Sequence, residues 1–335
     1  MSAVLNVEQN CMCLFGSKQY NVSNVVGAAI GHDHALILLS NGCIVAINDT
    51  WYNKDSYLKS LIYNISEFNE ISYSRRGEQL QVLKLACGMN RSALISTSGQ
   101  LFSWGERNHA NVSNWSLHDG TKLIDVACGF YHTVFIDSSG RVWSFGDNRH
   151  GSLGRGIPST VSPTESSSNA HIAVDVEPRL VEGLGDEIMW QRVSCGWAHT
   201  VIRGVNRNGT TIVACWGRND MGQFPIDISS KESSVNVSHR VHFFQKLPDD
   251  SNFFEVWAGS EFTIVADDYG KLWSCGWNEH GNLGNDNYLN GTVWTPVLKT
   301  DKNYVGNKLC HMKLSIVWEG ALSCGGAHVL AITNK

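Results

Sequence analysis

The sequence has few charged residues, few prolines and no long apolar run. Charged residues make up 17% of its 335 positions, and 6 prolines stand beside 32 glycines. Few charges with many glycines favour a turn-rich β protein over a helical one, and no segment keeps helical periodicity over several turns. No 18 consecutive residues are apolar, which excludes a membrane-spanning helix. The hydrophobic content of 42% is still sufficient for a sizeable core.

Signals for export and for nucleic-acid binding are also missing. The segment Met1–Glu8 lacks a charged region followed by an apolar stretch, so we expect no secretory signal. Lys and Arg are scattered along a chain of net charge −5, which argues against a large DNA or RNA footprint. We therefore expect a monomer of the cytoplasm, the nucleus or both, without direct nucleic-acid or membrane contact. Its 10 cysteines are expected to be free thiols.

One pattern recurs along the chain. It reads as a short apolar strand, a small residue with glycine, two or three variable residues, a second apolar strand, a glycine turn and an aromatic-Gly ending. In three copies the two landmark glycines lie 17 residues apart, whereas Gly196 and Gly217 are 21 apart. The excess lies at residues 206–209, which predicts a longer hairpin turn there. The first glycine of each copy is Gly31, Gly88, Gly129, Gly196, Gly259 or Gly325.

Each copy predicts a meander of short strands. The turns Ser98-Gly99, Ser139-Gly140 and Tyr269-Gly270 separate apolar runs, as tight hairpins do. A single meander cannot bury both of its faces, and radial stacking of several meanders into a propeller solves this. The chain begins with the aromatic-Gly strand Cys13–Gly16 and ends with a copy that lacks this strand. We predict that the N-terminal strand completes the last blade and closes the ring, which removes an exposed sheet edge.

The best copies resemble the repeats of the regulator of chromosome condensation family. The residues that carry the resemblance are Cys128-Gly129-x-x-His132-Thr133, the segment Gly140–Gly154 and the segment Trp273–Gly284. The resemblance extends from Cys11 to Thr333. It implies an all-β fold with one closed β-propeller over residues 1–335. Six blades are legible, and because the family usually has seven, a degenerate seventh within residues 50–82 stays open.

Three segments depart from the repeat. Residues 157–175 and 229–240 are rich in polar residues and are predicted to be exposed loop insertions. Residues 50–82 form a degenerate or inserted segment. Loops on a rigid scaffold often carry function, but tolerated insertions are the simpler interpretation of all three.

The repeated cysteines and histidines are predicted to be structural. Cys87, Cys128, Cys195 and Cys324 precede the first glycine of their copies, and alanine fills the same place before Gly259, as expected of a small packing group. A catalytic histidine should be singular, so a histidine that recurs three residues after the glycine suits a hydrogen-bonding or packing role. No nucleophile elbow, phosphate loop or zinc motif occurs. We therefore expect no enzymatic activity, no metal and no cofactor.

The variable residues after the first glycine form turns on one face of the ring. Neighbouring exposed aromatic residues on such a face suggest a protein-binding hot spot, although the rings could instead pack under neighbouring loops. The turn after the second glycine, such as Arg218-Asn219-Asp220, is expected on the opposite face, with its asparagine serving turn geometry. The predicted partner-binding residues are Asp33, Asn90, Arg91, Phe130, Tyr131, Trp197 and Glu261.

The sequence favours a non-enzymatic protein–protein interaction propeller that acts as a regulatory or scaffold subunit. Gly259-Ser260-Glu261 and Trp277–Asn282 resemble fungal stand-alone members of the alpha-tubulin-suppressor type. That likeness implies a small zinc protein partner in diphthamide synthesis and Elongator-dependent tRNA modification. Glu177–Leu184 resembles an animal stand-alone member that partners a JmjC demethylase, which implies a chromatin-modifying enzyme as the partner.

The alternative function is guanine nucleotide exchange on a Ran-type small GTPase. In exchange-factor members of the family, the face described above meets the GTPase through acidic and histidine residues. The sequence offers only Asp33 and Glu261 as acids in these turns, and it lacks both a projecting hairpin and a basic N-terminal tail. These absences make exchange the second choice.

Overall fold

The described part of the chain consists of β-strands and the turns that join them. The computed structural model describes residues 13–15, 18–20, 25–32, 34–47, 62–64, 81–89, 91–105, 112–148, 150–155, 174–226, 238–297, 321–324 and 329–332. Within these ranges no helix is long and apolar enough to cross a membrane. The predicted all-β class is confirmed.

The strands form sheets of neighbours in sequence. Three four-stranded sheets comprise β3 (Val25–Ile30), β4 (Ala35–Leu39), β5 (Ile44–Ile47) and β6 (Ile62–Asn64); β7 (Val82–Cys87), β8 (Arg91–Ser96), β9 (Leu101–Gly105) and β10 (Val112–Trp115); and β11 (Leu123–Cys128), β12 (His132–Asp137), β13 (Val142–Asp147) and β14 (Val174–Leu180). Two more comprise β15 (Ile188–Cys195), β16 (His199–Asn206), β17 (Thr211–Gly217) and β18 (Ser238–Phe244); and β19 (Phe253–Ala258), β20 (Phe262–Asp267), β21 (Leu272–Gly276) and β22 (Gly291–Pro296). Two short sheets pair β1 (Cys13–Phe15) with β2 (Lys18–Tyr20), and β23 (Ala321–Cys324) with β24 (Val329–Ile332). The strand pairs are antiparallel except β5–β6, which is parallel.

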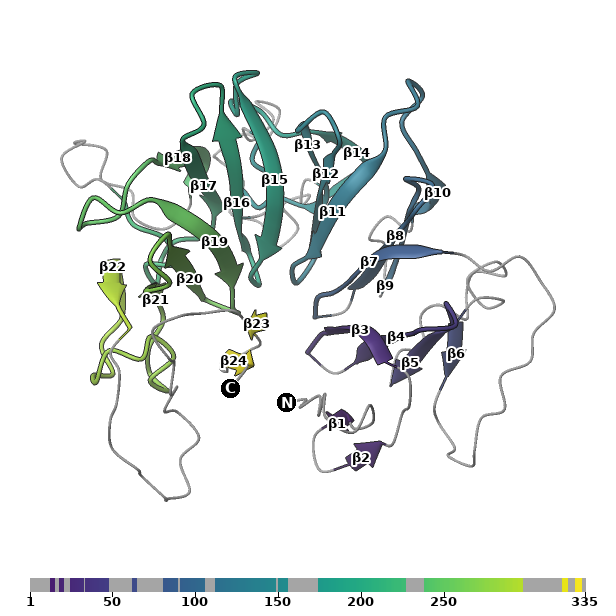
Figure 1. The fold of residues 1–335 in the computed structure, drawn as a ribbon, viewed down its shortest axis with the longest axis horizontal. Coiled ribbons are helices and arrows are strands. Elements are labelled where there is room, and N and C mark those ends of the chain that lie inside the picture. The colour runs from purple at the N-terminus through teal and green to yellow at the C-terminus, as the bar shows by residue number, and fades with distance from the viewer. Residues whose placement is uncertain are drawn as a thin grey trace, which may run out of the picture.

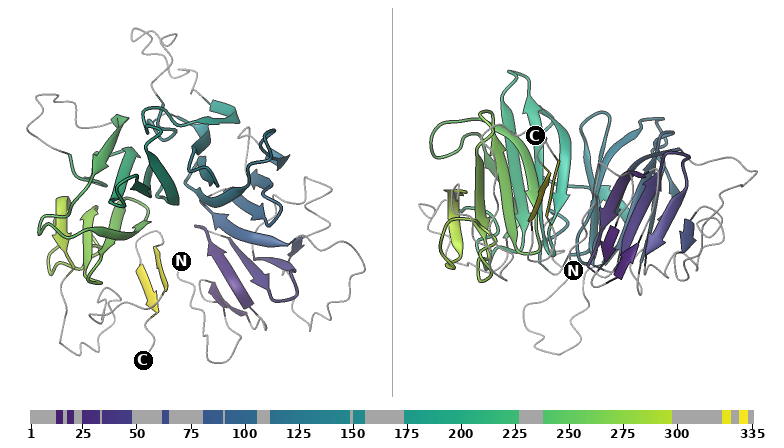
Figure 2. Two further views of the ribbon diagram at one scale, coloured as in Figure 1. Left: turned by 45° about the horizontal axis from the view of Figure 1, so that its top comes forward. Right: turned by 60° about the horizontal axis from the view of Figure 1, so that its bottom comes forward.

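The sheets stand side by side around a common centre (Figure 1). The first strands of the four-stranded sheets, β3, β7, β11, β15 and β19, lie innermost, and each contacts the first strand of the next sheet from β3 to β19. In the tilted view, the β23–β24 pair lies between the β19–β22 sheet and the β3–β6 sheet (Figure 2). This arrangement is that of propeller blades.

The second strands are the most deeply buried strands of the blades, and three of them are buried along their whole length. All six residues of β8, of β12 and of β20 are buried. A strand covered by a neighbouring blade on each side must be apolar at nearly every position, because both of its faces meet protein. This explains the continuous apolar runs that the sequence repeats.

The hydrophobic core lies between the blades. In one cluster Val134 and Val142 of the third blade pack with Trp190, Ile202 and Trp216 of the fourth. In the next cluster Val201 and Cys215 of the fourth blade pack with Trp273 of the fifth. Each blade therefore completes the core of its neighbour and cannot bury its own apolar surface alone.

The four additional residues of the fourth copy do not lengthen its turn. Asn206 N–H donates to the Thr210 carbonyl and Gly209 N–H to the Asn206 carbonyl, which is the pattern of the hairpin at residues 137–141. Counted up to the second landmark glycine, β16 and β17 instead have eight and seven residues, where β12 has six and β13 has five (residues 142–146). The predicted longer turn is wrong, because an insertion split evenly between two paired strands preserves both the register and the turn.

The described ranges touch the predicted insertions only at their ends. Residues 174–175 belong to β14 and 238–240 to β18, so these five residues are strand and not loop. The rest of 157–175 and 229–240 lies outside the described residues, as does 50–82 apart from 62–64 and 81–82. The predicted N-terminal strand exists as β1, but its described partner is β2. Closure of the ring and the number of blades remain predictions.

The first glycine of each repeat stands where two blades approach most closely. A Cβ atom at Gly129 would lie 2.7 Å from the carbonyl oxygen of Gly196 and would overlap the ring of His132. Equivalent Cβ atoms at Gly31, Gly88 and Gly196 would overlap the carbonyl of the next repeat glycine. The repeat requires glycine here because backbone from the next blade occupies the space of a side chain.

Replacement of a repeat glycine should therefore weaken the ring. We expect Gly129→Ala to lower the free energy of unfolding by about 1–3 kcal/mol, as overpacking does in a dense core. Gly27→Ala is the control, because its Cβ would lie an ordinary 3.8 Å from Leu38. Urea unfolding measures both variants. Equal unfolding midpoints for the two would contradict the proposed close approach.

Candidate functional site

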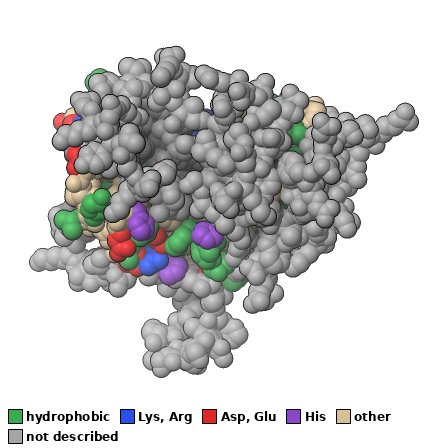
Figure 3. All heavy atoms as spheres, turned by 90° about the horizontal axis from the view of Figure 1, so that it is seen from below, with side chains coloured by type: hydrophobic (Ala, Val, Ile, Leu, Met, Phe, Trp, Pro, Cys, Tyr) green, Lys and Arg blue, Asp and Glu red, His purple; other side chains and the backbone are tan. Residues whose placement is uncertain are grey.

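Turns from three successive blades meet at one face of the ring. Phe130 and Tyr131 follow β11, Trp197 follows β15 and Glu261 follows β19. Phe130 N–H donates to the Trp197 carbonyl, and Trp197 N–H donates to the Ser260 carbonyl, each over 2.8 Å. The turn of each blade is thereby held against the turn of the next. Hydrophobic, acidic, basic and histidine side chains lie next to one another on the face seen from below (Figure 3).

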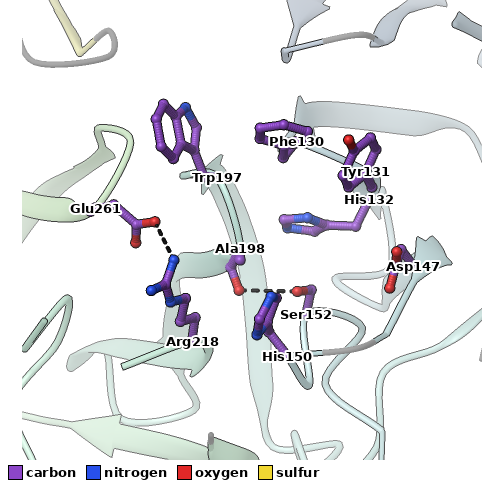
Figure 4. A pocket seen from close by; sticks show the side chains of 10 residues that line it. All are labelled: Phe130, Tyr131, His132, Asp147, His150, Ser152, Trp197, Ala198, Arg218 and Glu261. Atoms are coloured by element: carbon purple, nitrogen blue, oxygen red, sulfur yellow. Dashed lines mark hydrogen bonds and ion pairs between the residues drawn. The ribbon is translucent and has the colours of Figure 1, made fainter. Parts of the chain in front are cut away.

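A pocket of about 170 Å³ opens between these turns (Figure 4). It lies across the blades of β11–β14, β15–β18 and β19–β22. Its lining residues are Phe130, Tyr131, His132, Asp147, His150, Ser152, Trp197, Ala198, Arg218 and Glu261.

Aromatic rings form one wall of the pocket. The rings of Phe130 and Trp197 meet edge to face, with centroids 5.9 Å apart and an interplanar angle of 86°. The ring centroids of Tyr131 and Phe130 are 4.1 Å apart, and those of His32 and Trp197 are 6.4 Å apart. Phe130, Tyr131 and Trp197 are all half-buried, so part of each ring remains accessible. Edge-to-face contacts of this kind hold the rings in place.

An ion-pair network forms the opposite wall. Arg218 Nη1 donates to Glu261 Oε1 over 2.9 Å, and Arg218 Nη2 donates to Asp220 Oδ2 over 2.6 Å. Gln223 Nε2 donates to the other Glu261 oxygen over 2.5 Å. The Glu261 side chain is buried and spans the gap between the fourth and fifth blades. Both of its oxygens are occupied, which fixes their orientation.

The two carboxylates of this network differ in their titration. Burial raises the pKa of Glu261, even though hydrogen bonds from Gln223 and Arg218 and the charge of Arg218 act in the other direction. Burial also opposes ionisation of Asp220, but hydrogen bonds from Arg218 and Gln223 outweigh it and lower the pKa of that carboxyl group. Of these two acids, Glu261 is therefore the one whose ionised form a further cation would stabilise more.

The three repeat histidines whose placement is described each lie within hydrogen-bond distance of a hydroxyl group of the next blade. His34 Nε2 lies 2.9 Å from Ser92 Oγ, His132 Nε2 lies 3.0 Å from Thr200 Oγ1, and His199 Nε2 lies 3.1 Å from Thr263 Oγ1. The predicted structural role of these histidines is confirmed. Burial lowers the pKa of His132 and of His199 to about 3, so both rings are neutral at neutral pH.

Four of the predicted site residues come together here. Phe130, Tyr131, Trp197 and Glu261 all line the pocket. Arg91 does not, which corrects its placement on the face: its side chain is 2% exposed and donates to Thr133 Oγ1 over 3.4 Å. It occupies the histidine position of its blade and so points into the interface with the next one. Asp33 and Asn90 lie outside the described residues.

Arg218, Asp147 and Ser152 also line the pocket, although the turn of Arg218 was expected on the opposite face. That expectation is wrong. Arg218 N–H donates to the Ala198 carbonyl and Asp147 N–H to the Tyr131 carbonyl, each over 2.9 Å. In a meander the turns after the first and third strands lie at the same end of the sheet, because every strand reverses direction. Counting the strands of the repeat would have identified these residues, because the turns that follow odd-numbered strands all lie at the same end of the blade.

Two of the cysteines that precede repeat glycines, Cys128 and Cys195, have unreactive thiols. Burial raises the pKa of Cys128 to about 12 and raises that of Cys195 further, so both thiols stay protonated. Among the residues whose placement is described, no three His, Cys, Asp or Glu side chains could hold a metal ion together.

Comparison with known proteins identifies the repeat. Residues 123–152 and 139–203 match models described as the regulator of chromosome condensation (RCC1) repeat. A human RCC1-like G exchanging factor-like protein is 33% identical over 97 residues, which make up 29% of this chain and 19% of that protein. The aligned region is thus about a fifth of the length of such curated relatives.

Solved structures share the fold. Human WBSCR16 has a TM-score of 0.59 and 18% identity, covering 83% of this chain and 68% of its own. Prp20p from Saccharomyces cerevisiae has a TM-score of 0.64 and 16% identity, covering 93% and 69% respectively. The Prp20p structure was reported together with the binding of that protein to Gsp1p and histones.

The neutral buried histidines make stability depend on pH. A histidine with a pKa of about 3 when folded and about 6.5 when unfolded is protonated first in the unfolded chain. Stability is therefore full above about pH 6.5 and falls as the pH drops toward 3, by up to about 1.4 kcal/mol per pH unit for each such histidine. We expect His199→Phe to reduce this slope, because phenylalanine already occupies the position as Phe262 in the next blade.

Urea unfolding at pH 7, 6 and 5 measures the slope for both proteins. The comparison concerns the pH dependence and not the absolute stability, since the variant also loses the bond to Thr263. An unchanged slope in His199→Phe would mean that His199 does not titrate as described.

Proposed function

Because the chain belongs to the family of proteins built from RCC1 repeats, we propose that it is a non-enzymatic interaction propeller whose pocket face binds a protein partner. It acts as a regulatory or scaffold subunit. The observation that carries the proposal is the convergence of Phe130, Tyr131, Trp197 and Glu261 from three blades on one pocket. Half-buried aromatic residues beside a buried ion pair have the composition of a binding hot spot.

We also propose that the ring closes through a blade shared by the two short sheets. β1 and β2 supply two strands, β23 and β24 supply two more, and the other blades have four strands each. In that blade β1 would pair with β24. Amide hydrogen exchange tests this: deletion of residues 1–20 should speed exchange in β24 and leave β12 unchanged. Equal exchange of β24 with and without those residues would reject the shared blade.

Two kinds of partner follow from the sequence resemblances. One is a small zinc protein that serves diphthamide synthesis and tRNA modification, and the other is a chromatin-modifying enzyme. Affinity capture from the native cell followed by mass spectrometry distinguishes them. Recovery of a small zinc protein bound to the pocket face would support the first kind of partner, and recovery of a chromatin-modifying enzyme would support the second. The location of the complex in the cell would then follow from the partner.

Substitution on the pocket face should weaken capture without unfolding the ring. We expect Trp197→Ala to reduce partner affinity at least about tenfold, as removal of a central hot-spot aromatic does. Tyr269→Ala is the matched control, because Tyr269 is 78% exposed and lies in the β20–β21 hairpin at the far end of its blade. Quantitative mass spectrometry of material bound to each bait measures the change, and circular dichroism checks folding. An equal loss of partner affinity in both variants, or a loss in Tyr269→Ala alone, would show that the partner does not bind at the pocket face.

The second candidate is guanine nucleotide exchange. It is favoured by the likeness to the human RCC1-like G exchanging factor-like protein. Release of a fluorescent guanine nucleotide from purified Ran-type and related GTPases tests it directly. Release that does not accelerate at saturating concentrations of the chain would reject exchange, while binding of the same GTPases would still agree with an interaction propeller.

A further inference from the structure

Given the proposed role of this face as a protein-binding surface, we infer that the pocket receives one arginine side chain of the partner. The chemistry that recognises it is a negative, partly buried ion-pair network on one wall and accessible aromatic rings on the other (Figure 4).

The charge of the pocket favours a cation. Two acids, Asp147 and Glu261, line it together with one base, Arg218, and Asp220 adds a third carboxylate beside that base. The buried guanidinium of Arg91 interacts with the charge of Asp147 and is the second base of this region, so the described acids still outnumber the described bases. The floor histidine His132 contributes no positive charge at neutral pH, since its pKa is about 3. An added cation would also offset the burial that raises the pKa of Glu261.

The same network disfavours an acidic partner residue. Arg218 Nη1 is held by Glu261 at 2.9 Å and Nη2 by Asp220 at 2.6 Å. A carboxylate from the partner would have to displace one of these contacts and would face the carboxylates that remain. Bidentate recognition of an acid by Arg218 is therefore unfavourable.

The aromatic wall distinguishes arginine from other cations. Trp197 and Phe130 come from neighbouring blades, are half-buried and line the cavity, with Trp197 above Glu261 and Arg218 and Phe130 across from them (Figure 4). Cations are attracted to such rings by about 0.5–2 kcal/mol, with arginine the more frequent partner. The planar guanidinium can stack on a ring and donate to a carboxylate at once, which the compact ammonium of lysine does less well.

The size of the pocket suits one side chain. Its 170 Å³ is below the roughly 300–1,000 Å³ of pockets that take drug-sized ligands. The partner would therefore place one residue in the pocket and rest its backbone on the surrounding turns.

Selection from a random peptide library displayed on phage tests the inference without knowledge of the partner. The full chain serves as bait, and peptides that also bind Trp197→Ala are removed. We expect the remaining peptides to share an arginine at one position. Replacement of that arginine by citrulline, its neutral isostere, should weaken binding about tenfold or more.

Two variants of the chain complete the test. Glu261→Gln keeps the shape of the side chain. It should weaken binding of the arginine peptide by a similar factor and leave binding of the citrulline peptide unchanged. Glu187→Gln is the charge control, because Glu187 is exposed in the turn immediately before β15, at the opposite end of that strand from Trp197, and it should alter neither affinity.

The outcomes separate this inference from the proposed function. Trp197-dependent peptides that share an acidic or purely apolar residue, or that bind equally with citrulline, would overturn the arginine assignment and leave the protein-binding face in place. Absence of any Trp197-dependent peptide would overturn both. The citrulline comparison changes only the peptide, so it decides the question even if Glu261→Gln fails to fold.

Discussion

The architecture depends on one close approach, repeated from blade to blade at the first glycine of the repeat. The carbonyl of the next repeat glycine occupies the space that a Cβ atom would need at Gly31, Gly88, Gly129 and Gly196. A histidine three residues later then reaches a serine or threonine hydroxyl of the neighbouring blade. Because the contact is made by backbone, it tolerates no side chain and fixes the spacing of the innermost strands.

The pocket is a consequence of that spacing. Adjacent turns are held by backbone hydrogen bonds of 2.8 Å between Phe130, Trp197 and Ser260, so side chains from three blades enter one volume without a long loop to carry them. Glu261 then bridges to Arg218 across the blade boundary. A site on rigid turns is pre-organised, and a partner that binds it loses less conformational entropy than one that must order loops.

Burial divides the polar residues of this region into two groups. His132, His199 and Cys128 lie under the face with pKa values far from neutral pH, and their hydroxyl partners lie inside the ring. Glu261, Asp147 and Arg218 line the pocket and determine its charge. The first group holds neighbouring blades together, and the second gives the face its chemical character. This division explains why repeated histidines do not imply catalysis.

The repeat pattern in the sequence predicted the first three strands of the clearest blades and the turns that carry Phe130, Tyr131, Trp197 and Glu261, because a strand followed by glycine and a short turn fixes where the next residues emerge. It did not predict fourth strands such as β14 and β18, which begin inside segments expected to be loops. Tertiary structure decided the rest. Arg91 follows the same glycine spacing but is buried, since the third residue after that glycine points into the next blade. Arg218 and Asp147 joined the site because alternate turns of a meander return to the same end, although 21 and 16 residues separate them from Trp197 and Tyr131 along the chain. Local spacing therefore positions a turn, while only the packing of blade against blade determines which turns become neighbours and which side chains remain accessible.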